Sequence, residues 1–274
     1  MKLLISSSIF LFSLTSAVFA NNITVKPETV TDSGKFYVGV FGGLSASNNF
    51  NGSQYGTVFF IEGEGGPLSV NAFGKINNQN SSLFGAQLGY QTQGKSLNCS
   101  SWTLGSAAEL EGYTINKSSF DGDLSNNIER IPEHEFVVSY PMRRTVFLTN
   151  AVLNFNNPRF QFHPYIGLGV GSTVVKISGA SSTQISPAEE GVNHYNTNTG
   201  DTNSTFAGQA KLGLSYDINK YVSFFADYRW LYLANTHFVF GSTVIPDHAE
   251  TTSWQVGLDA QKYNVGNIGV RFSW

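Results

Sequence analysis

The sequence predicts an all-β protein, an eight-stranded antiparallel transmembrane up-and-down β-barrel with long extracellular loops. Three observations predict it. Eight segments alternate apolar and polar side chains, and charged residues form only 13% of the chain, against roughly 25% in an average soluble protein. The segment 268–274 also alternates and finishes on tryptophan. Strands of about 9–11 residues with this period are long enough to cross a bilayer at a tilt.

The first twenty residues predict a secretory signal peptide. Lys2 supplies a positive start, residues 3–14 are mostly apolar, and Ala17–Ala20 offers small residues for cleavage. The apolar run is shorter than the roughly 20 residues that a membrane-spanning helix needs. We therefore expect three parts: a signal peptide at 1–20, a short periplasmic segment at 21–34 and an outer-membrane barrel at 35–274.

The predicted strands follow one another in chain order. They occupy residues 36–44, 83–90, 102–113, 145–155, 162–172, 206–216, 222–231 and a last segment that ends at Trp274. The start of the eighth strand is ambiguous, because its alternation begins at Trp254 and is interrupted around Asn264. A long or bulged strand and a further hairpin both remain open.

The predicted connections alternate between long and short. The short connections at 156–159 and 217–220 are rich in asparagine, aspartate and proline, which favour tight turns. Short periplasmic turns and longer outer loops are typical of outer-membrane barrels. In the first long loop, the apolar run 57–61 binds a partner, packs on a neighbouring loop or extends a strand.

Sorting the two faces of the strands separates two kinds of barrel. One face is apolar and uncharged, with residues such as Val40, Phe84 and Leu168, while the other holds glycines and charges. A soluble ligand-binding barrel turns its apolar face inward, whereas a membrane barrel turns it toward lipid. Scarce charge favours the membrane barrel, as do aromatic residues near strand ends, where interface girdles form. The expected girdle residues are Tyr37, Tyr90, Trp102, Tyr113, Phe155, Tyr216, Tyr228, Trp230 and Trp274.

Six charged residues fall on the face predicted to line the lumen. They are Glu109, Glu111, Lys211, Asp227, Arg229 and Arg271. The interior of an eight-stranded barrel is just wide enough for side chains to fill, so the acids of the third strand can reach bases on strands six to eight. Buried ions are tolerated only when they are paired. We predict a salt-bridge network that plugs the lumen; a gated ion path is the alternative.

The last strand places four apolar residues on one face. These are Ile268, Val270, Phe272 and Trp274. We expect this face to contact outer-membrane lipid and to act as the C-terminal signature that the barrel-assembly machinery recognises.

Several strands together resemble a known family. The segments 34–43, 164–171, 206–217, 224–230 and 268–274 are similar to strands of the opacity and surface-antigen family, small outer-membrane barrels related in form to the OmpA transmembrane domain. The resemblance implies a multi-pass barrel in the bacterial outer membrane, with loops exposed at the cell surface and sometimes adhesive. It supplies no catalytic residues.

The expected function is therefore that of a non-enzymatic, structural surface protein, antigen- or adhesin-like, whose loops bind a host or environmental ligand. The expected partners are outer-membrane lipid, lipopolysaccharide, the barrel-assembly machinery and an extracellular ligand. The net charge of −3 gives no reason to expect nucleic acid. A narrow porin-like channel is the alternative, and a lipid-modifying enzyme ranks after it.

No cofactor, metal or catalytic site is expected. Loop acids such as Glu189 and Glu190 are interpreted as a solvated rim, and Cys99 is the only cysteine. The histidines show no clear Ser-His-acid pattern, and those in loops are interpreted as polar surface residues. They are His134, His163, His194, His237 and His248.

Overall fold

The computed structural model describes residues 34–274 except 93, 97–100, 129–130 and 247. The predicted signal peptide, almost all of the predicted periplasmic segment and Cys99 lie outside the described residues. Within the described part, no helix has the length and apolar character that crossing a membrane requires. The elements are β1 (Lys35–Ser47), β2 (Phe50–Val58), η1 (Glu62–Glu64), β3 (Leu68–Ile76), β4 (Asn80–Gln91), β5 (Lys95–Ser96), β6 (Thr103–Ile128), β7 (Ile131–Asn156), β8 (Phe162–Ser178), β9 (Ser181–Ser186), β10 (Gly200–Asp217), β11 (Val222–Leu233), β12 (Thr236–Phe240), β13 (Trp254–Leu258) and β14 (Gln261–Ser273).

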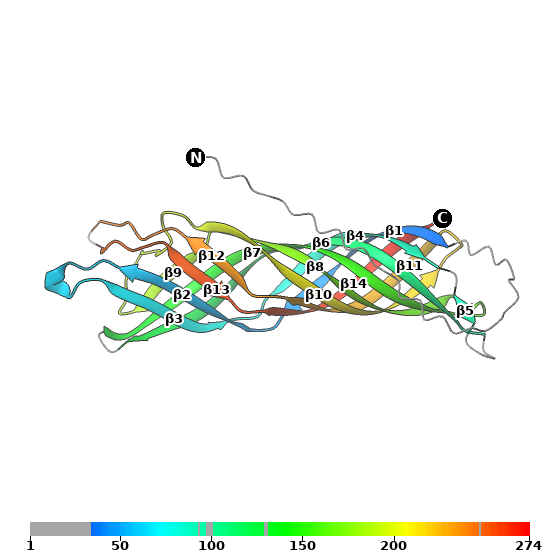
Figure 1. Ribbon diagram of the computed structural model, residues 1–274, viewed down its shortest axis with the longest axis horizontal. Coiled ribbons are helices and arrows are strands. Elements are labelled where there is room, and N and C mark those ends of the chain that lie inside the picture. Colours follow the sequence, from blue (N-terminus) through cyan, green and yellow to red (C-terminus); the bar gives the residue numbers. More distant parts are fainter. Residues whose placement is uncertain (1–33, 93, 97–100, 129–130, 247) are drawn as a thin grey trace, which may run out of the picture. The chain divides into compact units, whose positions relative to one another are not determined.

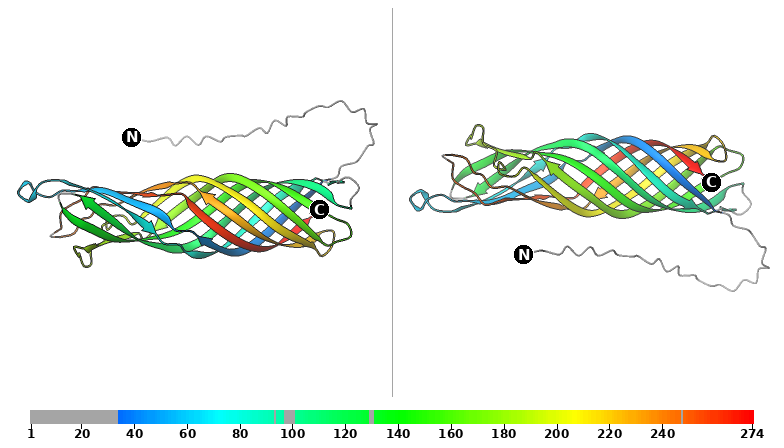
Figure 2. Two further views of the ribbon diagram at one scale, coloured as in Figure 1. Left: turned by 90° about the horizontal axis from the view of Figure 1, so that it is seen from below. Right: turned by 90° about the horizontal axis from the view of Figure 1, so that it is seen from above.

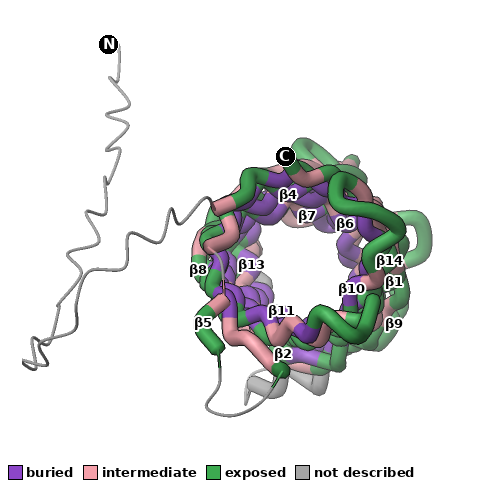
Figure 3. The backbone as a smooth tube through the Cα atoms, turned by 90° about the vertical axis from the view of Figure 1, so that its right-hand side faces the viewer, coloured by how far each residue is buried: buried purple, intermediate pink, exposed green. Residues whose placement is uncertain are grey.

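Eight of these strands close into a ring. The order β6-β4-β1-β14-β11-β10-β8-β7 is antiparallel throughout, and β7 pairs with β6 to complete it. Figure 3 looks along this ring and shows buried residues on its inner side. Closure leaves no free strand edge within the ring. The eight-stranded antiparallel barrel that the sequence predicted is confirmed.

Side chains alternate across the wall of the ring. Val40, Phe84 and Leu168 point outward and are 54%, 61% and 68% exposed, as their parity predicted. The prediction was wrong for Tyr37 and Tyr113, which were expected in an interface girdle but are buried in the lumen. Strand parity explains this, because Tyr37 shares its face with Gly39 and Tyr113 shares its face with Glu111.

An outward aromatic cluster marks one end of the ring, which we call the lower end, where β1 begins and β14 finishes. The Phe36 ring lies 4.8 Å from that of Tyr90 and 6.5 Å from that of Trp274. On the neighbouring strands, Phe162 and Tyr216 lie 4.9 Å apart. Aromatic rings at this level are typical of the boundary between lipid and water.

The predicted long loops are largely strands. At the opposite end from the aromatic cluster, β2, β3, β9, β12 and β13 join the outer halves of β6 and β7 in a second set, which we call the upper tier (Figures 1 and 2). Its pairing runs β12-β13-β2-β3-β6-β7-β9. Residues 193–198 connect its two ends, since the amide of His194 donates to Ser182 O and the amide of Gly241 donates to Asn198 O.

The ambiguity around the eighth strand is resolved by this upper tier. The ring strand β14 begins at Gln261, whereas β13 pairs with β2 and β12. The further hairpin therefore exists, but it extends the upper tier and adds no strand to the ring. The apolar run 57–61 extends β2 to Val58 and leaves Phe59 and Ile61 exposed.

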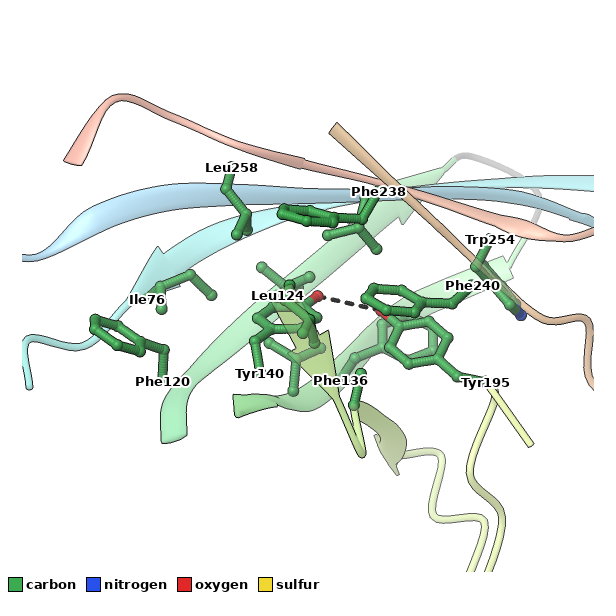
Figure 4. Packing of buried hydrophobic residues seen from close by; sticks show 14 of the residues in the cluster. Ile76, Phe120, Leu124, Phe136, Tyr140, Tyr195, Phe238, Phe240, Trp254 and Leu258 are labelled. Carbon is green, nitrogen blue, oxygen red and sulfur yellow. Dashed lines mark hydrogen bonds between the residues drawn. The ribbon is translucent and has the colours of Figure 1, made fainter. Parts of the chain in front are cut away.

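The interior of the upper tier is an apolar core. It contains large aromatic residues, with the Phe240 ring 4.7 Å from that of Tyr195 and 6.1 Å from that of Tyr140 (Figure 4). The Tyr195 hydroxyl donates to Gln54 Oε1 at 2.6 Å. Burial raises the pKa of both Tyr140 and Tyr195 above the ordinary value, so both phenols stay neutral at physiological pH.

Candidate functional site

The lumen charge network consists of the six charged residues predicted from the sequence, and the ring order places their strands around the lumen. Glu109 and Glu111 both project inward from β6, two residues apart. The strand β11, which carries Asp227 and Arg229, is four places away from β6 in either direction around the ring. The acids of β6 therefore face β11 directly across the lumen. All six side chains are buried, and their three acids and three bases balance in charge.

Four ion pairs connect these strands across the lumen. The Lys211 ammonium contacts Glu109 Oε2 directly and lies 3.5 Å from Glu111 Oε2. Arg229 Nη1 contacts Glu111 Oε1, and Arg271 Nη2 lies 3.5 Å from Glu109 Oε1. Each acid of β6 therefore bridges to two bases on different strands.

Arg229 is also held from its own strand. Its Nε donates to Asp227 Oδ1 at 2.7 Å and its Nη2 donates to Asp227 Oδ2 at 3.1 Å. Two parallel hydrogen bonds of this kind fix the plane of a guanidinium as well as its charge. Arg229 therefore joins the acids on opposite sides of the lumen.

Neutral side chains satisfy the remaining carboxylate oxygens. The Tyr37 hydroxyl donates to Glu109 Oε1 at 2.6 Å, and the Tyr165 hydroxyl donates to Asp227 Oδ2 at 2.9 Å. Amide groups complete the set: Asn150 Nδ2 donates to Glu111 Oε2 at 3.1 Å and Asn267 Nδ2 donates to Asp227 Oδ1 at 3.0 Å. Buried charges need such partners.

Aromatic rings cover the two arginines. The guanidinium carbon of Arg229 lies 4.4 Å from the ring centroid of Phe41, and that of Arg271 lies 4.4 Å from the ring centroid of Tyr37. Cation–π contacts contribute most when the pair is removed from water. Each guanidinium thus lies against a carboxylate and an aromatic face, which fills the lumen with side chains.

Glycines make room for these inward rings. Tyr37 pairs directly with Gly89 on β4, and Tyr165 pairs directly with Gly213 on β10. A Cβ atom at Gly89 would lie 2.2 Å from the Tyr37 ring, and one at Gly213 would lie 2.3 Å from the Tyr165 ring. Gly89 and Gly213 therefore leave space for the two rings whose hydroxyls hydrogen-bond the buried acids.

One buried charge was missed by the sequence analysis. Arg144 points into the lumen from β7 at the junction of the ring and the upper tier, and it is fully buried. It shares its face with Asn150, which could have revealed it. The predicted strand began at Thr145, so Arg144 was placed in a loop.

The prediction that the loop histidines are polar surface residues was wrong for His194. His194 is only 3% exposed, and its ring lies 5.7 Å from that of Trp254 in the upper tier. His248 and Glu189 are next to it. His163 is at the lower end of the ring, where its Nε2 lies 3.1 Å from Asp217 Oδ2. Loop placement misled the prediction, because the connection after β9 folds back into the core.

A large apolar hollow lies on the outer wall of the ring. It has a volume of about 670 Å³, and Leu214, Phe224 and Ile268 are among its lining residues. These three side chains belong to the outward apolar face, so the hollow opens on the side of the wall that faces lipid.

Comparison with known proteins identifies the family. The family model described as Surface antigen matches residues 75–274, which include every ring strand except β1. No curated protein sequence matches the chain. The resemblance of the strands to surface antigens is thus confirmed over most of the chain.

Several solved outer-membrane structures show a distant likeness. Neisserial surface protein A is 13% identical over 89% of this chain and 99% of its own, with a TM-score of 0.37. The attachment invasion locus protein Ail of Yersinia pestis, solved with the heparin analogue sucrose octasulfate, is 11% identical over 86% and 99%, with a TM-score of 0.33. The outer membrane protease OmpT from Escherichia coli is 9% identical over 90% and 99%, with a TM-score of 0.26. Scores this low carry no argument about function.

The fold and the family agree with each other. The ring has an apolar outer face and a charged, closed inner face, which is the arrangement of a barrel in an outer membrane. The chain belongs to the surface antigen family and is a β-barrel surface protein of the bacterial outer membrane.

Proposed function

We propose that the protein is a non-enzymatic structural surface protein, whose upper tier stands outside the membrane and whose loops bind an extracellular ligand. The observation that carries this proposal is the filled interior. The lumen charge network occupies the ring, and the aromatic core around Tyr140 and Phe240 occupies the upper tier. Packed side chains in both the ring and the upper tier support a display role over the alternative of a narrow pore.

Conductance tests the closed lumen. Wild-type protein in a planar bilayer is expected to show no stable large open state, whereas Arg271→Ala is expected to raise any leak, because it removes a side chain that spans from β14 to Glu109. Lys35→Ala is a suitable control, since Lys35 is exposed at the lower end. A stable large open state of the wild-type protein would exclude the plug.

Surface display is tested by epitope insertion. Gly63 lies at the tip between β2 and β3, and no atom lies within 4 Å of the position that its Cβ would take. An epitope after Gly63 is expected to bind antibody on intact cells. An epitope after Asn219, in the short turn at the lower end, is expected to bind only after permeabilisation. The reverse result would invert the orientation.

Ligand binding through the loops needs its own measurement. Deletion of residues 59–66 removes the exposed Phe59 and Ile61 while leaving the paired part of β2 in place. Cells carrying this deletion are expected to lose adherence to a host or environmental surface that the wild type colonises, with no change in permeability. Unaltered adherence would contradict binding through this loop.

A basic cluster supports contact with lipopolysaccharide. Arg143 on β7 and Lys176 on β8 are directly paired and exposed. They lie nearer to the upper tier than the outward apolar residues Phe147 and Val174 of the same strands. Lys117 on β6 is exposed near them and donates to Ser178 O at 3.2 Å. Positive charge just beyond the apolar belt suits the phosphates of lipid A. Arg143→Glu with Lys176→Glu is expected to reduce co-purified lipopolysaccharide, and Lys35→Glu is the control.

Three further parts of the proposal rest on the sequence. They are the signal peptide at 1–20, the periplasmic segment at 21–34, and recognition of Ile268, Val270, Phe272 and Trp274 by the barrel-assembly machinery. Secreted mature protein should begin at Asn21. The absence of enzymatic activity predicts an unchanged lipid A profile in strains with and without the protein.

A further inference from the structure

Three potential metal ligands meet at the outer end of the upper tier. Glu189 and His194 belong to the connection between β9 and β10, and His248 belongs to the connection between β12 and β13. Glu189 Oε2 lies 3.2 Å from His194 Nε2 and 3.4 Å from His248 Nε2. The three ligand atoms all lie within 4.8 Å of one another.

Backbone carbonyls orient both imidazole rings. His194 Nδ1 lies 3.0 Å from Ser182 O, and His248 Nδ1 lies 2.6 Å from Ala249 O. A carbonyl oxygen can only accept, so each Nδ1 carries the proton, and in a neutral ring the lone pair is on Nε2. Both lone pairs then face the same carboxylate oxygen. This is the arrangement in which histidine binds a metal through one nitrogen and is held by a hydrogen bond from the other.

The carboxylate oxygen at the centre is otherwise unsatisfied. Glu189 Oε2 is buried, and its nearest described partners are the two imidazole nitrogens, neither of which is aligned for a regular hydrogen bond with it. Buried polar oxygens nearly always have a partner. Two neutral imidazole lone pairs cannot supply one, whereas a cation between the three atoms satisfies them all.

We propose that Glu189, His194 and His248 bind one divalent transition-metal ion of the zinc class. Two imidazole nitrogens and one carboxylate oxygen are a common zinc set, and bonds of about 2.0–2.1 Å place neighbouring ligands of a tetrahedron roughly 3.3 Å apart. The distances of 3.2 and 3.4 Å from Glu189 match this spacing. Imidazole ligands favour zinc over magnesium or calcium, which select oxygen.

The surroundings have space for the rest of the coordination shell. The three side chains line a cavity of about 210 Å³, whose walls also include Phe136 and Trp254. A water molecule needs about 10–15 Å³ of such volume, so solvent can complete the coordination of the ion. The Phe136 ring packs edge-on against His194 at 5.5 Å, which limits how far that ligand can move.

The ion would connect two loops that are far apart in the sequence. Glu189 and His194 hold one side and His248 the other, so metal binding joins the β9–β10 connection to the β12–β13 connection. An ion that binds the folded site and not the unfolded chain stabilises the folded state. Zinc would therefore stabilise the outer end of the upper tier.

The test uses the full mature protein, folded in detergent, without a histidine tag and stripped with a chelator. Zinc chloride is titrated in competition with a chromophoric chelator. We expect one site per chain, with affinity at least tenfold weaker in Glu189→Gln and in His248→Gln. His163→Gln is the matched control, because His163 also faces a carboxylate, 3.1 Å away at the lower end, and should leave zinc affinity unchanged.

X-ray absorption of the zinc-loaded protein is the second measurement, and it should show two imidazole ligands. Heat-dependent gel migration checks that each variant is folded. If His248→Gln disturbs the upper tier, Glu189→Gln still tests the site, because glutamine has the size of glutamate. No stoichiometric zinc on the folded wild type would overturn the proposal. Equal affinity in wild type and Glu189→Gln would also overturn it, and so would tight calcium binding with no zinc binding.

Discussion

The guanidinium of Arg144 lies 4.3 Å from the ring centroid of Phe120, at the junction of the ring and the upper tier. Its Nε donates to Gln261 Oε1 at 3.3 Å, while its Nη1 has no hydrogen-bond partner among the described residues. No described carboxylate forms an ion pair with it. Arg229 is buried to the same degree but contacts both Glu111 and Asp227. We therefore expect Arg144 and Arg229 to respond to replacement in opposite ways.

Replacement of Arg144 by methionine is expected to leave the free energy of unfolding unchanged or to raise it. The change removes a desolvated charge and leaves no described buried acid without its base. Methionine also keeps most of the apolar contact with Phe120. Replacing a buried ionic group with an apolar one of similar volume is often neutral or stabilising by about 1–4 kcal/mol. Urea unfolding in lipid vesicles measures the difference. A loss above about 2 kcal/mol would show that an unseen partner holds Arg144.

Replacement of Arg229 by methionine is expected to lower the free energy of unfolding by about 3–5 kcal/mol. Asp227 would keep a buried charge without its base, and among the described bases Glu111 would keep only Lys211, 3.5 Å away. The same urea titration measures it. Adding Glu111→Gln should recover part of the loss, since it removes one of the two carboxylate charges that Arg229 balanced. Additive losses in the double variant would argue against a direct pair between Arg229 and Glu111.

Replacement of Gly213 by valine should displace the ring of Tyr165, which packs directly against Gly213. The new Cβ would lie 2.3 Å from the Tyr165 ring, and displacing that ring would weaken its hydrogen bond to Asp227. Overpacking of this kind costs about 1–3 kcal/mol. Heat-dependent gel migration should show a lower transition temperature. Gly266→Ala is the control, because no atom lies within 4 Å of its added Cβ; equal effects at both positions would contradict a steric cause.

Replacement of Leu168 by arginine tests the depth of the lipid-facing belt. Leu168 is 68% exposed in the middle of β8, and an arginine facing lipid near the bilayer midplane costs about 2–4 kcal/mol. Thr202→Arg, paired beside Lys176 beyond the belt, should cost little. Unfolding in phospholipid vesicles compares the two variants. A harmless Leu168→Arg would mean that this face contacts water.

Much of the ring could be predicted because one physical rule governs it. Lipid on the outside and close-packed side chains on the inside force period two on every strand, so the outward positions of Val40, Phe84 and Leu168 followed from parity. The same parity predicted the inward direction of the six lumen charges. Tyr37 was misplaced because nearness to a strand end was weighed above its parity.

The upper tier could not be predicted, because its strands turn apolar side chains inward, whereas the ring turns its charged side chains inward. On β6 a register shift between Ile115 and Ser118 exchanges the two faces. Odd residues such as Glu111 point inward below the shift, whereas even residues such as Phe120 and Leu124 point inward above it. A one-residue bulge has this effect in any strand, and no periodicity rule applied to the whole segment would reveal it.

The sequence by itself therefore determined the class of protein, the number of ring strands and the side of the wall that each ring residue takes, because alternation is a local property of the chain. Only the tertiary structure decided which charges meet across the lumen, that Arg144 is buried with Phe120, and that Glu189, His194 and His248 come together. Those relationships depend on ring closure and on how the upper tier folds back over itself, and both join residues that are far apart in the sequence.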